Sequence, residues 1–413
     1  MDEDVEITDS PAIRAVNVLL FHWIQNEELG ALVLDARDGL RAPVELESQW
    51  QTQLAELGSE PDEPLAPDCV ERLAAMAGIR GRFSTRRQGG RFRLICQDRL
   101  WSFDVEIAPR GASAVVRKED LMEAEFQRRF GCRPPELERV QGLFADDHAF
   151  RRTLEKVLYF HGAVLEPLQR RGMTRDDRIL DLASGDGEMS LALALAGHRR
   201  ITMVDLDAAR LDRAARLVRE LAGDDIELTA TQGSAVDLED DHDVLICFQT
   251  LEHLSDEGNY ARASRSCQRR YLERVDRHIG KLVYFNAPNR WYPIDGHDTG
   301  KPGFHWLPMS IRSWLIARGV VENSWSGIAE PVTLDFLRRG LPHFRLVSRY
   351  YAFDDALDYM ASYPPFDYMG RLYPQVRADH LPWKKRVIVR LSRMLGSRAH
   401  NLLPFLSVVL ARR

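Results

Sequence analysis

The spacing of apolar residues predicts an N-terminal region of mixed helix and strand. Ile13, Val16, Leu19, Leu20 and Trp23 recur at the spacing of one helix face. Farther on, ALVLDA, RFRLICQ and WSFDVEIAP are strand-like runs, and the last two alternate around a short connection, which predicts an antiparallel hairpin. We therefore expect an α+β accessory domain over residues 1–118.

A charged, helical segment follows over residues 119–170. Phe150, Leu154, Val157 and Leu158 mark one helix face, and we expect a connector that covers the next domain without chemistry of its own. From 171 to 413, strand-like runs alternate with helical ones, in the order RILDLA, ITMVDLD, IELTATQ, DVLICFQT, KLVYFNAP and FLSVVLARR. This alternation predicts an α/β domain with a doubly wound, mainly parallel sheet.

Composition narrows the function classes. The 413 residues are 45% hydrophobic and carry a net charge of −6, which argues against a protein that coats nucleic acid. Five cysteines form no CxxC pair, so we expect no disulfide framework and no structural zinc site. The acidic N-terminus differs from a signal peptide and no apolar run reaches about 18 residues, so we expect a cytoplasmic protein.

A glycine turn, RILDLASGDGEMS, joins a predicted strand to a predicted helix. Such a turn suits either a dinucleotide pyrophosphate or the carboxylate of an amino-acid-like cofactor. The dinucleotide pattern G-x-G-x-x-G fails in both alignments, because Ser190 or Glu188 occupies the third glycine position. An acidic side chain there would repel a pyrophosphate, whereas Asp181 at the strand end suits an ammonium group. A nicotinamide cofactor is therefore disfavoured.

Acidic residues also follow the second predicted strand. Asp205 lies at its end, where a carboxylate accepts hydrogen bonds from two ribose hydroxyls. Asp207, two residues on, is interpreted as a helix N-cap. After the third strand, Gly233, Ser234 and Ala235 lie where an adenine would bind.

The motifs DLASGDG, MVDLD, GSAVDL and ICFQTLEHL, in this order and spacing, resemble those of class I S-adenosylmethionine-dependent methyltransferases. The resemblance covers residues 171–413 and implies a Rossmann-like methyltransferase sheet with S-adenosylmethionine as cofactor. It implies these cofactor-binding residues: Asp181, Ala183, Ser184, Gly185, Gly187, Asp205, Leu206, Ser234, Ala235 and Gln249. Two residues depart from the usual motifs, since Ala183 replaces the first glycine and Ser234 replaces an acid.

The methyl acceptor is expected beyond the carboxyl ends of the strands. DVLICFQTLEHLSD brings Gln249, Glu252 and His253 there, and His253 either takes a proton from the acceptor or packs and caps locally. The loop YFNAPNRWYPIDGHDTGKPGFHWLP is dense in groups that bind polar ligands: Asn286, Asn289, Arg290, Trp291, Tyr292, Asp295, His297, Asp298, His305 and Trp306.

Three interpretations of this loop compete. A P-loop fails because Pro302 follows Gly300-Lys301. A metal site of His297, Asp298 and His305 matches no standard ligand spacing, so no metal is expected. The favoured interpretation is a loop that faces a polyhydroxyl acceptor through stacking and hydrogen bonds.

The string PNRWYP…HDTG…HWLP resembles a loop in bacterial methyltransferases encoded among surface-glycan genes. That likeness implies a hydroxyl acceptor in a glycan or glycan-lipid. We expect acceptor contacts from Asn289, Arg290, Trp291, Tyr292, Asp295 and Trp306. A hydroxyl acceptor requires a general base, and His253, His297 and His305 stay open as candidates.

Basic residues gather near the C-terminus. No acidic residue occurs from Trp383 to Arg413, and residues 384–398 fit either a basic amphipathic helix at the inner membrane face or a solvated helix. The front region, residues 10–118, resembles the domain that precedes the motor in type II secretion and type IV pilus ATPases, although no GxxxxGK[ST] motif occurs. This resemblance implies a role in protein contacts or self-association.

Three functions follow from these patterns. The favoured one is a methyltransferase. The others are a nicotinamide oxidoreductase and a catalytically silent binding platform that acts through its N-terminal domain.

Overall fold

The computed structural model describes residues 16–17, 19–20, 23–24, 31–35, 39–41, 65–77, 79, 85–96, 99–223, 225–234, 237, 239–256, 262–295, 297–323, 327–348 and 405–413. The chain divides into two units, Met1–Glu125 and Phe126–Arg413. Helix α4 (Leu121–Phe130) crosses this boundary, so the predicted connector 119–170 is divided between the units. Within these described ranges, no helix has the length and apolar character needed to cross a membrane.

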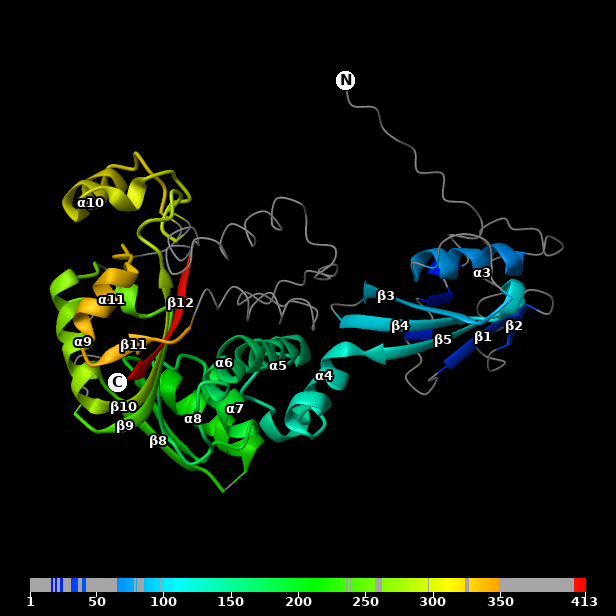
Figure 1. The fold of residues 1–413 in the computed structure, drawn as a ribbon, viewed down its shortest axis with the longest axis horizontal. Helices are drawn as coiled ribbons and strands as arrows, with labels where there is room; N and C mark the ends of the chain where they lie inside the picture. The colour runs from blue at the N-terminus through cyan, green and yellow to red at the C-terminus, as the bar shows by residue number, and fades with distance from the viewer. Residues whose placement is uncertain are drawn as a thin grey trace. The chain divides into compact units, whose positions relative to one another are not determined.

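An antiparallel sheet with the strand order β2-β1-β5-β4-β3 forms the first unit. Its strands are β1 (Ala31–Asp35), β2 (Gly39–Arg41), β3 (Gln88–Cys96), β4 (Arg99–Ile107) and β5 (Ser113–Asp120). The predicted hairpin is confirmed, because β3 and β4 pair antiparallel through to Cys96↔Arg99. Helix α3 (Leu65–Met76) lies along one face of this sheet, which makes the unit α+β as expected (Figure 1).

Aromatic side chains fill the core of the first unit. The Trp23 ring lies 5.7 Å from the Phe103 ring, and Phe103 stacks on Phe92 at 4.9 Å. Val16, Leu19 and Leu20 are buried in the same cluster, as the helical spacing predicts, whereas Ile13 lies outside the described residues. The apolar face of the first predicted helix therefore packs into this core.

The second unit contains a seven-stranded mixed sheet in the order β11-β12-β10-β9-β6-β7-β8. The strands are β6 (Arg178–Leu182), β7 (Arg200–Asp205), β8 (Glu227–Gln232), β9 (His242–Phe248), β10 (Ile279–Pro288), β11 (Phe344–Leu346) and β12 (Phe405–Arg412). Strands β6 to β10 are parallel, and β12 lies antiparallel between β10 and β11. Successive strands β6, β7 and β8 are added toward one side of the sheet, whereas β9 and β10 are added on the other side of β6. The strand order therefore reverses between β6 and β9, and such folds bind ligands at this switch point.

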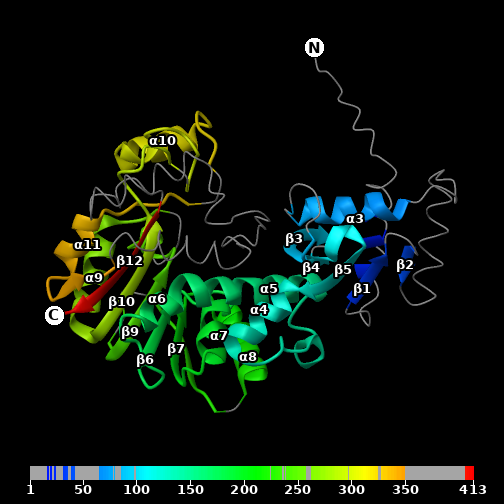
Figure 2. The same cartoon turned by 45° about the vertical axis from the view of Figure 1, so that its right-hand side comes forward.

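Helices cover both faces of this sheet (Figure 2). One face carries α5 (Asp147–Phe160), α6 (Glu166–Gln169), α7 (Glu188–Leu195) and α8 (Ala208–Ala222), and the other carries α9 (Arg265–His278) and α11 (Leu334–Gly340). A further helix, α10 (Met309–Ala317), follows the loop after β10. The expected doubly wound Rossmann-like sheet is therefore confirmed.

Helices α9 and α11 pack closely against each other and against the sheet. Tyr271, Leu272 and Val275 of α9 are buried against β10 and α11. A Cβ at Gly340 would lie 2.5 Å from Leu272 Cδ1, so glycine allows α11 to approach α9. The packing places the carboxyl ends of β6, β7, β9 and β10 at one edge of the sheet.

Candidate functional site

The turn between β6 and α7 adopts a left-handed backbone at three positions. The φ angles of Ala183, Gly185 and Gly187 are 53°, 58° and 85°. A Cβ at Gly187 would lie 2.9 Å from Ala214 Cβ, so glycine is required where α7 meets α8. Ala183 keeps the left-handed conformation at a cost of about 1–2 kcal/mol. The turn thus has the backbone of a glycine loop despite the alanine.

The carboxylate of Asp205 joins two turns at the end of β7. Its Oδ2 accepts a hydrogen bond from the Gly185 N–H at 2.9 Å, and its Oδ1 accepts from the Asp207 N–H at 3.0 Å. The Gly233 N–H donates to the Asp205 carbonyl at 3.0 Å, which brings the turn after β8 to the same edge. A carboxylate oxygen can accept more than one hydrogen bond, so Asp205 can still bind ligand hydroxyls.

Asp207 caps helix α8. Its Oδ1 accepts from the Arg210 N–H at 3.0 Å, which confirms the N-cap interpretation. Asp205 therefore accepts hydrogen bonds from the backbone of the turns, whereas Asp207 caps the helix.

Asp181 is buried below the glycine turn. Its Oδ2 accepts a hydrogen bond from the Ser190 hydroxyl at 2.6 Å. Burial raises the pKa of Asp181 to about 7, and the charges of Glu188 and Asp205 act in the same direction, while the Ser190 hydrogen bond opposes them. Ser190, the residue that breaks the dinucleotide pattern, is thus the partner of the buried acid.

Sequence reasoning missed Arg210, which lies over the outside of the turn. Its Nε and Nη2 bind the two Asp186 carboxylate oxygens at 2.8 and 2.6 Å. The hydrogen bond from Arg210 lowers the pKa of Asp186. Twenty-four residues separate the pair, so no local pattern signals it.

The ends of β9 and β10 meet at Gln249. This residue has a φ of 48°, and its N–H donates to the Asn286 carbonyl at 2.8 Å. The Asn286 side chain donates to Ser407 Oγ of β12 at 2.5 Å. A short 3₁₀ turn, Leu251–His253, follows and carries Glu252. Gln268 of α9 donates to the Leu251 carbonyl at 2.9 Å and so fixes this turn.

Glu252, His253 and His297 form the cluster where the two strand ends meet. Glu252 Oε1 lies 3.9 Å from His253 Nε2 and 3.9 Å from His297 Nε2. The two imidazole ring centroids are 4.9 Å apart. Glu252 is fully buried, and neither carboxylate oxygen has a hydrogen-bond partner among the described residues. Such a buried, unsatisfied carboxylate is rare and requires an explanation.

Burial and neighbouring charges shift the pKa values of Glu252, His253 and His297 in different directions. Burial raises the pKa of Glu252 to about 7, against the opposing charge of His297. Burial, with the charge of His297, lowers the pKa of His253 to about 3. Burial also disfavours charged His297, but its hydrogen bond to Asp298 and the charge of Glu252 outweigh that effect and raise its pKa.

A metal site of His297, Asp298 and His305 was also considered from the sequence. Asp298 and His305 do not belong to the cluster of Glu252, His253 and His297, and they make other contacts. His305 Nε2 donates to the Arg290 carbonyl at 3.0 Å, and Trp306 Nε1 donates to the same oxygen at 2.6 Å. Asp298 instead binds Nδ1 of His297 at 2.9 Å. Burial lowers the pKa of His305. His305 therefore holds the loop backbone, and the set His297, Asp298 and His305 does not converge.

Two residues predicted to contact the acceptor are buried and make contacts within the loop. Asp295 is 3% exposed, and its carboxylate accepts from the Asp298 N–H at 3.2 Å and the Thr299 hydroxyl at 2.9 Å. Asn289 is 2% exposed and accepts from the Trp291 N–H at 3.0 Å. Buried backbone donors need acceptors, and these two side chains supply them within the loop. Acceptor contact by Asn289 and Asp295 stays a prediction.

Aromatic side chains of the same loop remain accessible. Trp291 is 57% exposed and Trp306 is 48% exposed, while Tyr292 is half-buried. Acceptor contact by these three rings stays a prediction.

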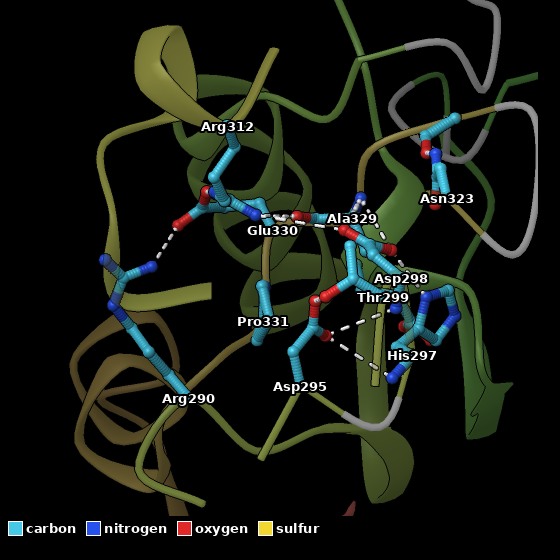
Figure 3. A network of polar contacts seen from close by, with 12 residues as sticks. Arg290, Asp295, His297, Asp298, Thr299, Arg312, Asn323, Ala329, Glu330 and Pro331 are labelled. Carbon is cyan, nitrogen blue, oxygen red and sulfur yellow. Dashed lines mark hydrogen bonds and ion pairs between the residues drawn. The ribbon is translucent and has the colours of Figure 1, made fainter. Parts of the chain in front are cut away.

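Sequence reasoning also missed a network of arginines around Glu330 (Figure 3). Its Oε1 accepts from Arg265 Nη2 at 2.5 Å and from Arg290 Nη1 at 2.7 Å, and its Oε2 accepts from Arg312. Arg312 is fully buried and also donates to the Ala329 carbonyl at 2.6 Å. Arg290, predicted to contact the acceptor, thus binds Glu330. The members come from distant segments, so no spacing indicated them.

The other predicted positions have backbone contacts or lie outside the described residues. The Ser184 carbonyl accepts from the Gly187 N–H at 2.9 Å, and the Leu206 carbonyl accepts from Gln232 Nε2 at 3.1 Å. The Ser234 carbonyl accepts from the Asp237 N–H at 2.9 Å. Ala235 and the basic segment 384–398 lie outside the described residues.

Comparisons with known proteins bear on this unit. Residues 179–271 match a family profile described as a methyltransferase domain. No curated protein matches the chain. Among solved structures, the chain is similar to geranyl diphosphate C-methyltransferase from Streptomyces coelicolor A3(2), with 14% identity, 71% of this chain and 97% of that chain covered, and a TM-score of 0.36.

The chain is also similar to magnesium protoporphyrin IX methyltransferase from Synechocystis PCC 6803, with 13% identity, coverage of 52% and 86%, and a TM-score of 0.34. An S-adenosylmethionine-dependent methyltransferase from Mesorhizobium loti gives 16% identity, coverage of 60% and 96%, and a TM-score of 0.33. None of these structures is similar enough to indicate a substrate. The chain thus contains a segment that matches a methyltransferase domain, on a sheet of the Rossmann-like methyltransferase fold.

Proposed function

We propose that the second unit binds S-adenosylmethionine and transfers its methyl group to a hydroxyl of a glycan or glycan-lipid acceptor. The observation that carries the proposal is the arrangement of Asp181, Gly185 and Asp205 at one sheet edge. It lies within the segment that matches a methyltransferase domain.

The residues at this edge fit the chemical groups of the cofactor. Asp181, whose pKa is raised to about 7, is a carboxylate that suits an ammonium group when it is ionised. Asp205 is held by two backbone donors and retains acceptor capacity for ribose hydroxyls. Gly185 and Gly187 carry no side chain at two positions of the turn, next to the N-terminus of α7, where a carboxylate is stabilised. Gln249 and Ser234 lie at the neighbouring strand ends.

The loop after β10 supports a polyhydroxyl acceptor. Exposed Trp291 and Trp306 offer flat apolar faces of the kind that stack on sugar rings. The buried contacts of Asn289, Asp295 and His305 hold this loop rather than the acceptor. A lipid-linked acceptor would suit the basic segment 384–398, which we propose contacts the membrane surface.

The reaction needs little from the protein besides position and removal of a proton. When bound, S-adenosylmethionine supplies a methyl carbon on a sulfonium, and the carbon–sulfur electron pair leaves to sulfur as the oxygen–carbon bond forms. The protein would hold the acceptor oxygen in line with the methyl carbon and the sulfur, which lowers the barrier. The acceptor proton must also leave, and Glu252, His253 and His297 lie at the edge where this happens.

Calorimetric titration of the full chain with S-adenosylmethionine and with NAD tests the cofactor. We expect binding of the first and none of the second. Asp205→Ala should weaken binding at least tenfold, because the ribose contacts are lost. Asp207→Ala is the matched control: it removes an equal charge two residues away and should cost only helix stability, about 1 kcal/mol. No binding at millimolar S-adenosylmethionine contradicts the proposal.

Transfer of radiolabelled methyl groups to glycan and lipid extracts tests the acceptor. We expect Trp291→Ala to reduce labelling strongly, whereas Trp314→Ala, an equally exposed tryptophan on α10 (53% exposed), should leave it unchanged. Cofactor binding without any labelled product would favour the silent binding platform instead.

A further inference from the structure

We propose that Glu252, His253 and His297 bind a divalent transition-metal ion that holds the acceptor hydroxyl. The metal site stands on the geometry alone, and only its role toward the acceptor rests on the proposed methyl transfer. The sequence predicts no metal here.

The three side chains already converge as ligands do. One carboxylate oxygen and two imidazole nitrogens lie within 4.8 Å of one another. Ligand atoms about 2.0–2.2 Å from a zinc ion are about 3–3.5 Å apart. The observed 3.9 Å separations from Glu252 to both imidazoles require only a small contraction of side chains. Elsewhere in the described part of the chain, no other group of such residues converges.

The buried carboxylate points to a missing partner. Glu252 is 0% exposed, and both of its oxygens lack hydrogen bonds among the described residues. Burying a carboxylate without a partner costs several kcal/mol. The imidazoles at 3.9 Å are too distant to hydrogen-bond with it. A bound cation compensates for this cost, because it binds the carboxylate and both nitrogens at once.

The surroundings of His297 match the support that metal ligands have. Its Nδ1 lies 2.9 Å from Asp298 Oδ1, which leaves Nε2 directed toward Glu252. Metal-binding histidines commonly donate their second nitrogen to a carboxylate in this way. Asp298 is itself buried and accepts from the Ala329 N–H at 3.1 Å (Figure 3). Asp298 is therefore a positioning residue.

The backbone on the Glu252 side is equally fixed. The Glu330 N–H donates to the Glu252 carbonyl at 2.8 Å. The Glu330 side chain is held in turn by Arg265, Arg290 and Arg312. The turn that carries Glu252 and the loop after β10 are thus connected through one network, in which Glu330 and Arg312 are buried.

The ligand set indicates the class of metal and its use. Two imidazoles and one carboxylate suit zinc, manganese, iron or cobalt better than calcium or magnesium. Three protein ligands leave an open position for an oxygen ligand. A metal-bound hydroxyl has a lowered pKa, so its proton passes to water while the oxygen attacks the methyl carbon. Under this assignment His253 and His297 are ligands rather than bases.

The test is metal binding by the full chain after dialysis against a chelator. We titrate with Co²⁺, Mn²⁺ and Zn²⁺ and follow Co²⁺ absorption, Mn²⁺ spin resonance and calorimetry. We expect one ion per chain, with at least 100-fold weaker binding in Glu252→Gln and His297→Gln. Asp298→Asn should weaken binding about 10–100-fold and alter the cobalt spectrum.

The matched control is His305→Gln, which changes a buried histidine of the same loop and keeps a donor for the Arg290 carbonyl. It should bind metal as the wild type does. No stoichiometric uptake by the wild type, or equal losses in His305→Gln, overturns the site. S-adenosylmethionine titration of the same variants confirms folding. It also separates the two proposals, since failure of cofactor binding with intact metal binding rejects only the methyl transfer.

Discussion

At the scale of single residues, the burial of Asp181 affects both the stability of the protein and the proposed binding of the cofactor. Its pKa is raised to about 7 from an ordinary value of 3.8. Since the folded value is the higher one, the contribution to stability is fully present below pH 3.8. It is lost as pH rises through about 7, where the buried carboxylate must ionise. The same ionisation creates the charge that would bind an ammonium group.

Asp181 therefore predicts a pH-dependent affinity. S-adenosylmethionine binding to the wild type should weaken about tenfold between pH 8 and pH 6, because Asp181 becomes neutral. Asp181→Asn should bind weakly and lack this trend, while it unfolds at higher denaturant concentration than the wild type at pH 8. Calorimetry across pH measures the first effect and urea denaturation the second. The Asp181→Asn variant also serves as the control for titration of the cofactor's own amine, because that titration affects both proteins equally. Identical pH trends in the wild type and the variant would refute the assignment.

Gly187 is the other residue whose identity decides local structure. We expect Gly187→Ala to lower the free energy of unfolding by about 2–4 kcal/mol, because it combines a left-handed φ with a clash against Ala214. Gly142→Ala has a similar φ of 94° but open space around it, so it should cost only the strain. Equal losses in the two variants, measured by urea denaturation, would remove the packing argument.

At the scale of elements, one carboxylate connects the loop after β10 to α9 and α10. Glu330→Gln should cost about 3–5 kcal/mol of unfolding free energy, because it removes the carboxylate that binds buried Arg312 and leaves only Asp298, 4.0 Å away, as an acidic partner. Protease cleavage within residues 289–306 should become faster. Glu227→Gln is the control, since its partner Arg200 is exposed and its loss should cost less than about 1 kcal/mol. Unchanged protease resistance in Glu330→Gln would show that the network does not hold the loop.

At the scale of the whole molecule, each unit has its own sheet and its own hydrophobic cluster. A chain of residues 120–413 keeps Asp120, whose Oδ1 accepts from the Met122 N–H at 3.0 Å at the start of α4. We expect this chain to bind S-adenosylmethionine with the affinity of the full protein. Calorimetry on both forms measures this, and a large loss of affinity would show that the first unit supports the site. A role of the first unit in protein contacts or self-association stays a prediction.

The local patterns were sufficient for the main elements and for naming candidate cofactor residues at the strand ends. Apolar spacing predicted the β3–β4 hairpin and the parallel strands, because side-chain periods of two and 3.6 record which face is buried. Asp205, Gly185 and Gly187 could be named as candidates because a turn and a strand end are themselves local features. Ser190 was noticed only as a missing glycine, and its contact with Asp181 needed the fold.

In the loop after β10, the sequence did not indicate which contacts the polar side chains make. Asn289 and Asp295 were predicted to contact the acceptor and His305 to be a candidate base, and the structure shows that all three also hydrogen-bond with the loop's own backbone. Glu330, Arg312 and Arg210 were missed because their partners lie many residues away. By itself, the sequence determined the elements, the class of sheet and the residues at the strand ends, since these follow from local periodicity. Only the tertiary structure decided which polar groups are buried together. Burial and convergence depend on packing between distant segments, and that is why the Glu252, His253 and His297 cluster was not foreseen.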